Sequence, residues 1–401
     1  MSSPMPTVYA VIPVFNRLHF TLECVDRLRR QTYPAVRVIV ADGGSTDGTV
    51  DVLRREHPDV VVLQEDRPLW WTGATRLGID WVLANSRQPD DMVLMVNNDT
   101  VFDPPYVETL VRVARDTGAA VGALIVDSRE PTRILDAGEF INWREYEFPV
   151  KTAIEPGEAR CDAVDTLPGR GSLVPLRMIR AAGNVDDRRF PHYIADYEFF
   201  VRLRRHGFKL VVTYEAQIAA HIDETGLTPE RRYHTLREMG KLLFSRRSMS
   251  NVVDHWRFIG RSAPPELRAT ARRRLIRMSV GMVLLQTKLR HLLVSVRPVR
   301  PVWRAVRFAA CGSYYVNERD CRACRVDPAA LVREGILRPW LRDGWYVFAV
   351  RRRTWWTSRR ELRPLWIRAW NPLRKLVKWM AARRYRAALS KGAAERGPTY
   401  P

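Results

Sequence analysis

The sequence predicts an α/β fold in which a mostly parallel sheet is flanked by helices, followed by a basic, mainly helical region. Three observations lead to this prediction. Apolar runs alternate with segments of helical periodicity over the first hundred residues, acidic residues stand where several of these runs end, and the excess positive charge lies in the second half of the chain. Strands separated by helices of about 10–15 residues pair in parallel, because each helix returns the chain across the sheet.

Four apolar runs are predicted as strands, at residues 8–12, 36–41, 60–63 and 92–96. Helical periodicity predicts the helices 18–30, 46–56 and 73–83 between them. In open parallel sheets, ligands bind beyond the carboxyl ends of the strands. Because Pro13, Asp42 and Asp99 follow three of these strands, we expect them to line one ligand site.

After the fourth strand the pattern becomes irregular between residues 127 and 167, which predicts an antiparallel extension or a long excursion near the site. A helix is predicted at 199–206 and a strand at 209–212, with Asp196 and Glu198 just ahead of the helix. We expect the first domain to span residues 1–226 and the second to span residues 227–401.

Charged residues are distributed unevenly along the chain. Residues 1–225 contain 26 Lys/Arg and 33 Asp/Glu, whereas residues 226–401 contain 40 and 11, together with nine of the 13 Trp. Basic helical patterns at 272–296 and 373–389 are typical of helices that lie on an anionic membrane surface, although helices packed on their own domain fit equally well. A region rich in Arg and Trp could also bind nucleic acid. No nucleic-acid-binding signature is present, however, so we expect no nucleic-acid partner.

Neither a secretory signal nor a membrane-spanning segment is expected. The segment before the first strand, residues 1–6, is short and polar, unlike a secretory signal. The longest uncharged apolar run of the basic half, at 278–286, is far shorter than the roughly 20 residues of a spanning helix. We therefore expect a cytoplasmic protein, peripheral on the inner face of the cell membrane. Five scattered cysteines fit a reducing compartment, and Cys311, Cys321 and Cys324 are either free thiols or part of a zinc site that lacks an evident fourth ligand.

Several motifs occur in a fixed order. Residues 11–17 read V-I-P-V-F-N-R, residues 39–49 read I-V-A-D-G-G-S-T-D-G-T, residues 97–99 read N-N-D, and residues 196–207 read D-Y-E-F-F-V-R-L-R-R-H-G. Together they resemble the inverting family-2 glycosyltransferases, which have the GT-A fold, and in particular bacterial rhamnosyl- and galactofuranosyl-type transferases of cell-envelope glycan synthesis. The resemblance extends from Val8 to about Asp223, a little over half of the chain.

The resemblance implies a donor site for a nucleotide-diphospho-sugar at Pro13, Phe15, Asp42, Arg76 and Asp99. A carboxylate at the position of Asp42 can accept hydrogen bonds from a base or a ribose. The residue after this acid is usually Asp or Asn in the family, whereas here it is glycine. Many members have Asn in place of Arg76, whose guanidinium would either pair with donor phosphate or cap a surface.

The same resemblance implies a divalent cation, Mn²⁺ or Mg²⁺, held by Asp99 and by His221. Only the last residue of the Asn97-Asn98-Asp99 motif is acidic. One carboxylate suffices for a hard cation that keeps several waters and shares its ligands with a diphosphate. A lone histidine after a strand is as often structural as a ligand.

Asp196 aligns with the acid that acts as the family's general base, while Ala195 replaces the Glu that usually precedes it. Acceptor contacts are implied for Glu198, Trp70, Trp71 and Gly171. Each has a structural alternative, because an acid favours a helix N-terminus and tryptophans are commonly core residues.

The sequence thus predicts a metal-dependent, inverting glycosyltransferase that uses a nucleotide-diphospho-sugar and a saccharide or polyprenyl-linked acceptor, at an anionic membrane surface. A nucleotidyltransferase shares the nucleotide-binding half-sheet, but it would normally show a Gly-rich basic phosphate loop after the first strand. A non-enzymatic polyanion-binding protein is the third interpretation, and the acidic first half argues against it.

Overall fold

The computed structural model describes residues 5–65, 67, 69–221, 235–286, 315–339 and 345–348. The chain forms two compact units, of which the first comprises Met1–Thr228 with Leu242–Leu275 and the second comprises Pro229–Lys241 with Ile276–Pro401. The division predicted at residue 226 lies outside the described residues, as do Cys311 and the helix predicted at 373–389. The structure adds residues 242–275 to the first unit.

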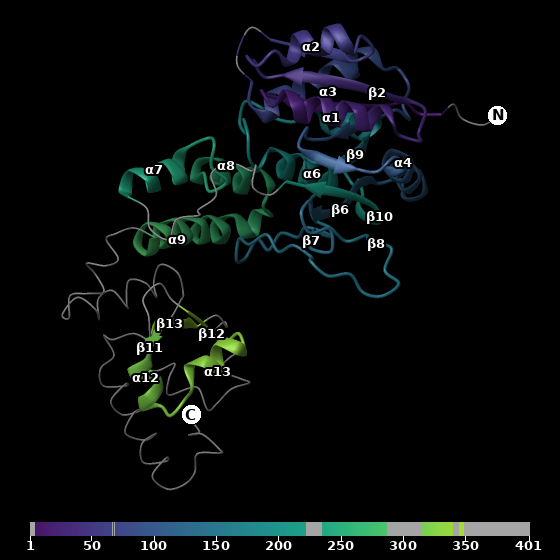
Figure 1. Cartoon of the computed structure of the whole chain (residues 1–401). Helices are drawn as coiled ribbons and strands as arrows, with labels where there is room; N and C mark the ends of the chain where they lie inside the picture. Colours follow the sequence, from purple (N-terminus) through teal and green to yellow (C-terminus); the bar gives the residue numbers. More distant parts are fainter. Residues whose placement is uncertain are drawn as a thin grey trace. The chain divides into compact units, whose positions relative to one another are not determined.

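A ten-stranded sheet lies at the centre of the first unit (Figure 1). Its order is β3-β2-β1-β4-β9-β6-β10-β5, with β7 paired to β6 and β8 paired to β10. The four strands at one side are β1 (Val8–Val14), β2 (Val36–Asp42), β3 (Val61–Gln64) and β4 (Met92–Met95). They are parallel to one another, which confirms the predicted half-sheet.

The other side of the sheet is mixed. Its strands are β5 (Thr100–Phe102), β6 (Ala120–Asp127), β7 (Ile134–Asp136), β8 (Arg160–Cys161), β9 (Ser172–Pro175) and β10 (Leu210–Ala220). The two longest, β6 and β10, are parallel, whereas β9 runs antiparallel between β4 and β6 and so joins the two sides. Every residue of β6 is buried, as expected for an apolar strand covered on both faces.

Helices cover both faces of the sheet (Figure 1), which confirms the predicted fold class. They are α1 (Leu18–Arg29), α2 (Thr49–Glu56), α3 (Trp71–Asn85), α4 (Tyr106–Thr117), α5 (Leu176–Ala182) and α6 (Ala195–Arg205). Successive strand residues point to opposite faces. Ile12 therefore packs in the core cluster that includes α1 and α4, and Val11 packs in the cluster that includes α3, α5 and α6.

Two predicted boundaries were wrong. Helix α6 begins at Ala195, not at residue 199, so Asp196 and Glu198 lie within its first turn, where the helix dipole favours acids. Strand β10 continues to Ala220, beyond the predicted end at 212. An irregularity in its register with β6, between Thr213 and Gln217, accommodates the charged Glu215 that interrupts the apolar pattern.

Three further helices follow, α7 (Leu236–Phe244), α8 (Val252–Ser262) and α9 (Arg268–Gln286), with a 3₁₀ turn at Pro265–Leu267. The Asn251 side chain caps α8 by accepting hydrogen bonds from the backbone N–H groups of Val253 and Asp254. Phe258 of α8 and Leu275 of α9 are buried in a cluster with aromatic residues of the first unit. None of the described helices combines the length and apolar character needed to cross a bilayer.

The described part of the second unit also contains a three-stranded antiparallel sheet in the order β11-β13-β12, in addition to helices. Its elements are β11 (Tyr315–Asn317), α12 (Glu318–Ala323), α13 (Pro328–Arg333), β12 (Leu337–Pro339) and β13 (Trp345–Phe348). Cys321 and Cys324 are both buried. Within the described ranges, no group of three or more His, Cys, Asp or Glu side chains is arranged to hold a metal ion.

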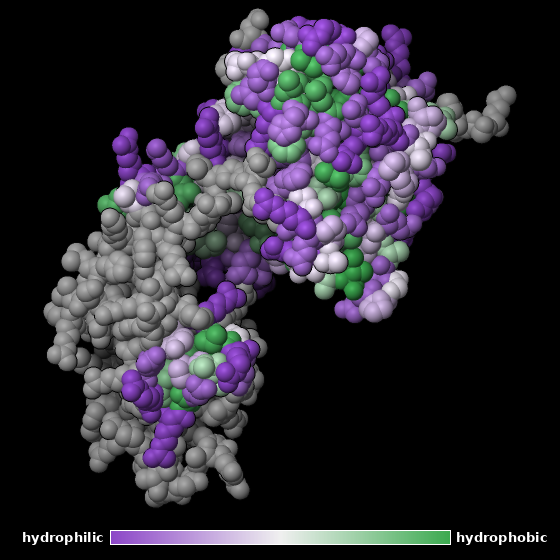
Figure 2. Space-filling view, viewed as in Figure 1, coloured by the Kyte–Doolittle hydropathy of each residue, from purple (hydrophilic) through white to green (hydrophobic). Residues whose placement is uncertain are grey.

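Figure 2 shows that hydrophilic residues cover most of the first unit on the face in view, with apolar residues in small separate groups. This distribution agrees with the burial of the large side chains in the two core clusters on either side of the sheet. In open α/β sheets, ligands bind at the loops that follow the carboxyl ends of the strands.

Gly78 provides a test of the contact between α3 and the sheet. A Cβ atom at this position would lie 2.4 Å from Cγ1 of Val11, in the middle of β1. We expect Gly78→Ala to lower the free energy of unfolding by about 1–3 kcal/mol, because overpacking outweighs the gain in helix propensity. In a double-mutant cycle measured by chemical denaturation, Val11→Ala should cost less in the Gly78→Ala background than in the native chain. Additive effects would contradict the proposed clash.

Candidate active site

Two loops at the carboxyl ends of β1 and β2 are tied together by side chains. Asn16 Oδ1 accepts a hydrogen bond from the backbone N–H of Thr46 at 2.9 Å, and the backbone N–H of Asn16 donates to the Ser45 hydroxyl at 2.7 Å. The N–H of Leu18 donates to Asp47 at 2.9 Å. Asn16 and Arg17 both have left-handed backbone conformations, with φ of 57° and 65°. Such strain persists only where surrounding contacts fix the conformation, and it often marks binding loops.

Asp42 ends β2 and is almost fully buried. Its Oδ2 accepts hydrogen bonds from the backbone N–H groups of Gly44 and Ser45, at 3.1 and 3.0 Å, and from the Gln64 amide at 3.3 Å. Its Oδ1 is buried and has no hydrogen-bond partner. One oxygen of this carboxylate therefore holds the loop, and the other can accept a hydrogen bond from a ligand.

Gly43 departs from the family pattern for a steric reason. A Cβ atom at this position would lie 2.8 Å from the carbonyl oxygen of Leu69 and 3.2 Å from that of Val14. The backbone of Gly43 donates to Val14 and accepts from Leu69, so this close approach is part of the loop structure. Nearby, Pro13 is half-buried in β1, and Phe15 is exposed at the sheet edge with 57% of its surface accessible.

Asp99 lies between β4 and β5, and its Oδ2 forms an ion pair with the Arg17 guanidinium at 3.2 Å. The two asparagines before it have structural partners. Asn97 Oδ1 accepts the indole N–H of Trp71 at 2.8 Å, and Asn98 donates to the Thr21 hydroxyl at 3.0 Å. Asp99 is thus the carboxylate that this segment presents at the edge of the sheet.

His221 lies beside Asp99. Thr100 of β5 pairs with Ala220 of β10 in antiparallel register, so Asp99 and His221 occupy neighbouring positions at the same end of the strand pair. The Nδ1 atom of His221 is 2.9 Å from the Ser128 hydroxyl, and its ring packs against Phe20 with centroids 5.5 Å apart. A hydrogen bond at Nδ1 orients the ring and leaves Nε2 as the nitrogen for a ligand.

Asp196 is the second residue of α6, two positions after the N-cap residue Ile194, whose φ is 67°. Its Oδ2 accepts the backbone N–H of Gly169 at 3.0 Å, and its Oδ1 accepts the N–H of Tyr197 at 3.0 Å. Burial raises the pKa of the Asp196 carboxyl, while these hydrogen bonds and the positive charge of Arg170 oppose that rise. A carboxylate with a raised pKa and a fixed orientation suits a general base.

Trp71 connects this carboxylate to the Asp99 segment. A Cβ atom on Gly169 would lie 2.4 Å from Cη2 of Trp71 and 3.3 Å from Cβ of Asp196, so the glycine backbone is packed between these two side chains. The indole N–H of Trp71 bonds to Asn97. Asp196 and the Asn97–Asp99 segment are therefore linked through one indole ring at one edge of the sheet.

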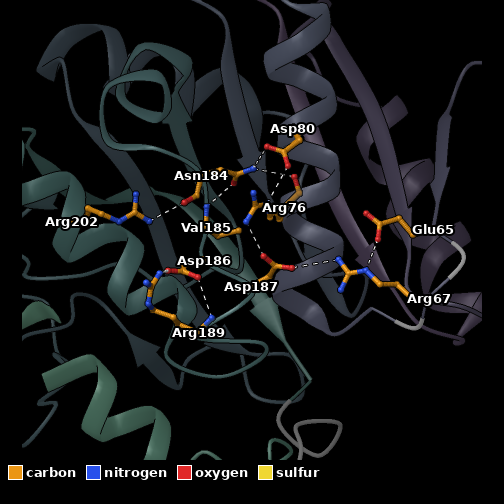
Figure 3. A network of polar contacts seen from close by, with 10 residues as sticks. All are labelled: Glu65, Arg67, Arg76, Asp80, Asn184, Val185, Asp186, Asp187, Arg189 and Arg202. Carbon is orange, nitrogen blue, oxygen red and sulfur yellow. Dashed lines mark hydrogen bonds and ion pairs between the residues drawn. The ribbon is translucent and has the colours of Figure 1, made fainter. Parts of the chain in front are cut away.

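Arg76 belongs to a network of polar contacts between α3 and the segment before α6 (Figure 3). Its guanidinium pairs with Asp187 at 2.9 Å and with Asp80 at 3.2 Å, and Arg67 approaches Asp187 at 3.6 Å. These ion pairs favour the structural alternative for Arg76 over the predicted contact with donor phosphate.

Glu198 and Gly171 also have structural surroundings. Glu198 is 2% exposed and pairs with Arg202 at 3.1 Å and with Arg261 of α8 at 3.0 Å, so its carboxylate is already paired with two guanidinium groups. Gly171 has φ of 81°, donates to Met95 and accepts from Tyr106. A Cβ there would lie 2.4 Å from the Tyr106 hydroxyl, so this glycine is required by the close packing.

Trp70 caps α3, and its ring lies 5.7 Å from that of His192, with the Arg247 guanidinium 5.7 Å from the indole. Burial, together with the charge of Arg247, lowers the pKa of His192 to about 4. The imidazole is therefore neutral at physiological pH. Of the two predicted tryptophans, Trp71 is a structural link and Trp70 has a partly exposed ring beside these neighbours.

Sequence reasoning missed two charged residues near Asp196. Burial raises the pKa values of Asp136, Asp196 and Tyr193, and the positive charge of Arg170 opposes this rise at each of them. A basic residue between two glycines was the available signal. Glu139 hydrogen-bonds the Tyr197 hydroxyl at 2.9 Å, but nothing in its local sequence indicates this position.

Comparison with known proteins agrees with this geometry. Residues 9–164 match the family model "Glycosyl transferase family 2". Succinoglycan biosynthesis protein ExoA of Rhizobium meliloti is 31% identical over 51% of this chain and 59% of its own length. The N-acetylglucosaminyl-diphospho-decaprenol L-rhamnosyltransferase of Mycobacterium tuberculosis is 27% identical over 48% of this chain and 69% of its own length.

Other matches are partial or distant. Glycosyltransferase GlyG of Streptococcus pneumoniae is 26% identical, over 28% of this chain and 37% of its own length. Among solved structures, GalNAc-T7 with UDP, GalNAc and Mn²⁺ gives a TM-score of 0.45 at 11% identity, over 74% of this chain and 59% of that chain. The mannosyltransferase PcManGT from Pyrobaculum calidifontis, with GDP-Man and Mn²⁺, gives 0.43 at 17% identity, over 76% and 86%.

The matched region thus covers 37% and 59% of the lengths of GlyG and ExoA. The family match begins within β1 and includes the loops that carry Asp42 and Asp99. Over residues 9–164 the first part of the chain is therefore similar to glycosyl transferase family 2, and the curated relatives agree with this match.

Proposed function

We propose that this protein transfers a sugar from a nucleotide-diphospho-sugar to an acceptor hydroxyl, with inversion at the anomeric carbon. The observation that carries the proposal is the gathering of Asp42, Asp99 and Asp196 at the carboxyl edge of one sheet, with Trp71 linking the last two. Separate carboxylates for donor, cation and acceptor proton are what such a displacement needs.

The donor nucleotide is proposed to bind between the loops after β1 and β2, beside Pro13 and Phe15. The unpartnered Oδ1 of Asp42 would accept an N–H of the base or a hydroxyl of the ribose. The exposed ring of Phe15 offers an apolar face at the same edge. Arg76 is left out of this proposal because its guanidinium is already paired with Asp187 and Asp80.

A divalent cation, Mn²⁺ or Mg²⁺, is proposed to bind at Asp99 and His221. A partly exposed carboxylate beside an imidazole with a free Nε2 fits a hard or borderline ion that keeps water and diphosphate oxygens as its other ligands. When bound, such an ion neutralises charge on the leaving nucleoside diphosphate. Arg17, which pairs with Asp99, would add positive charge at the same place.

Asp196 is proposed as the base that takes the proton from the attacking hydroxyl. Its two oxygens are held by backbone N–H groups, which fixes the direction in which the carboxylate faces. Trp70, partly exposed beside His192, is proposed to contact the acceptor saccharide.

The acceptor is proposed to be a saccharide or a polyprenyl-diphosphate-linked saccharide of the cell envelope. The name of the Mycobacterium tuberculosis relative describes a decaprenol-linked acceptor, and the Arg- and Trp-rich second half of this chain suits an anionic membrane surface. We place the protein in the cytoplasm, at the inner face of the membrane.

Asp42→Asn tests the donor site. Asparagine keeps an oxygen for the N–H groups of Gly44 and Ser45 but turns a donor group toward the ligand. We expect nucleoside diphosphate and sugar-nucleotide affinity to fall about 10- to 100-fold, the effect of losing a hydrogen bond to a charged group. Isothermal titration calorimetry measures this change. Unchanged affinity for every nucleotide bound by the native protein would reject Asp42 as a donor contact.

Asp99→Ala tests the cation site. We expect Mn²⁺-stimulated turnover to fall at least ~100-fold, since the cation supplies several kcal/mol of charge stabilisation. Asp103→Ala, which removes an exposed acid just after β5, is the matched control and should behave as the native protein. We would measure turnover as a function of Mn²⁺ concentration and follow Mn²⁺ binding by electron paramagnetic resonance. Equal metal dependence in both variants would exclude Asp99.

Asp196→Asn tests the base. Turnover should fall about 10²- to 10⁴-fold while sugar-nucleotide binding persists, because the amide cannot accept the proton. In the native protein, turnover should rise with pH through the raised pKa of Asp196, since only the ionised carboxylate is active. This rise should be absent from the residual activity of the variant. The surface variant Asp116→Asn is the control, and a fully active Asp196→Asn protein would place the base elsewhere.

A further inference from the structure

A second group of carboxyls lies behind Asp196. Glu139 is 8% exposed, and its backbone forms β-bridges with Val150, in the irregular excursion between β7 and β8, and with Thr166, which follows β8. Its side chain reaches Tyr197, the residue that follows Asp196 in α6. The proposed mechanism gives Glu139 no role, although it is buried and titratable.

The two oxygens of Glu139 have different surroundings. Oε1 accepts a hydrogen bond from the Tyr197 hydroxyl at 2.9 Å, whereas Oε2 is buried and receives no hydrogen bond from the described residues. A side-chain hydrogen bond between the Asp136 and Glu139 carboxyls contributes to the pKa of each, lowering that of Asp136 and raising that of Glu139. Two carboxyls can form a hydrogen bond only when one of them carries a proton. Asp136 already accepts the Gly138 N–H at 2.7 Å, which favours its charged form and leaves the proton on Glu139.

The charges around the pair point the same way. Burial raises the pKa of Glu139 well above its ordinary value, and the negative charges of Asp136 and Asp196 add to the rise, against the opposing hydrogen bond from Tyr197. Burial also raises the pKa of Asp136. The positive charge of Arg170 opposes the rise in the pKa values of Asp136 and Asp196.

One more acid approaches from the neighbouring segment. The backbone N–H of Asp165 donates to the Glu139 carbonyl. The Asp165 carboxylate accepts a hydrogen bond from the Ile141 N–H and forms an ion pair with Arg204. It therefore offers no proton donor to Glu139. The nearby Thr166 hydroxyl is buried without a hydrogen-bond partner and likewise makes no bond to Oε2.

We propose that Glu139 is an uncharged carboxylic acid at neutral pH, shares its proton with Asp136, and acts through Tyr197 as a positioning residue for Asp196. The contact chain runs from Asp136 to Glu139 and then to the Tyr197 hydroxyl, while the Tyr197 N–H holds Asp196. The catalytic part of this inference rests on the proposed function, whereas the protonation state of Glu139 does not.

The uncharged state matters for the base. A further negative charge beside Asp196 would make that carboxyl hold its own proton more tightly and leave less of it ionised at neutral pH. It would also repel an anionic diphosphate donor. Pairs of carboxyls whose surroundings separate their pKa values, one kept protonated and the other ionised, are a recurrent arrangement in enzyme sites.

Infrared spectroscopy of the full-length protein tests the protonation state directly. We expect the native protein at neutral pH to show the C=O stretch of a protonated carboxylic acid, and Glu139→Gln to lose it. Asp196→Asn should keep the band, which separates Glu139 from the neighbouring base. Glu155→Gln, an exposed acid of the same excursion, is the matched control and should also keep it. A native spectrum without a band that Glu139→Gln removes would overturn the proposal.

Turnover tests the positioning role. Glutamine mimics a protonated Glu139, since its amide can donate to Asp136 and its carbonyl can accept from Tyr197. We expect Glu139→Gln to stay within about threefold of native turnover, and Glu139→Met, similar in length but without hydrogen bonds, to lose more than about tenfold. Equal loss in both variants would show that the carboxylate charge is needed and would overturn the proposal. If the native protein transfers no sugar, the proposed function fails, while the infrared result still decides the state of Glu139.

Discussion

The packing of Gly169 between Trp71 and Asp196 is the constraint on which the rest of the site depends. Trp71 begins α3, Gly169 precedes β9, and Asp196 lies in α6, so three distant parts of the chain meet at one glycine. The hydrogen bond from the indole to Asn97 extends this contact to the segment that carries Asp99. A side chain at position 169 would force the ring and the carboxylate apart.

The acids of the first unit are distinguished by their partners, not by residue type. Glu198 is neutralised by two arginines, and Asp187 likewise lies between two arginines, so both hold the structure together. Asp42 has one oxygen bound and one unpartnered, which suits a ligand contact. Asp196 is bound by backbone N–H groups alone, so it remains able to accept a proton. The same carboxylate chemistry thus serves structural support and, in our proposal, donor binding and catalysis.

The first unit is discontinuous in sequence, and this affects the site. Arg261 of α8 pairs with Glu198, and Arg247 lies near the ring of Trp70, although both follow the main sheet by many residues. Phe258 and Leu275 are buried in a cluster with residues of the sheet-bearing part of the same unit, such as Ile141 and Phe190. Residues 242–275 therefore support α6 and the side of the site where we propose that the acceptor binds. They carry part of the chain's excess positive charge to that side.

The sequence by itself determined the parallel half-sheet and the two loops proposed to bind the donor, because short apolar strands, helical periodicity and strand-end acids are local patterns. Asp42, Asp99 and Asp196 were predicted as site residues from these patterns and from the motif resemblance. Only the tertiary structure decided which charged residues are already paired. Arg76 and Glu198 were candidate ligand contacts in the sequence, but each has an ion-pair partner outside its own helix, Asp187 and Arg261 respectively. Glu139 was missed for the same physical reason, since the contacts that favour its protonated state are made by residues brought together only by folding.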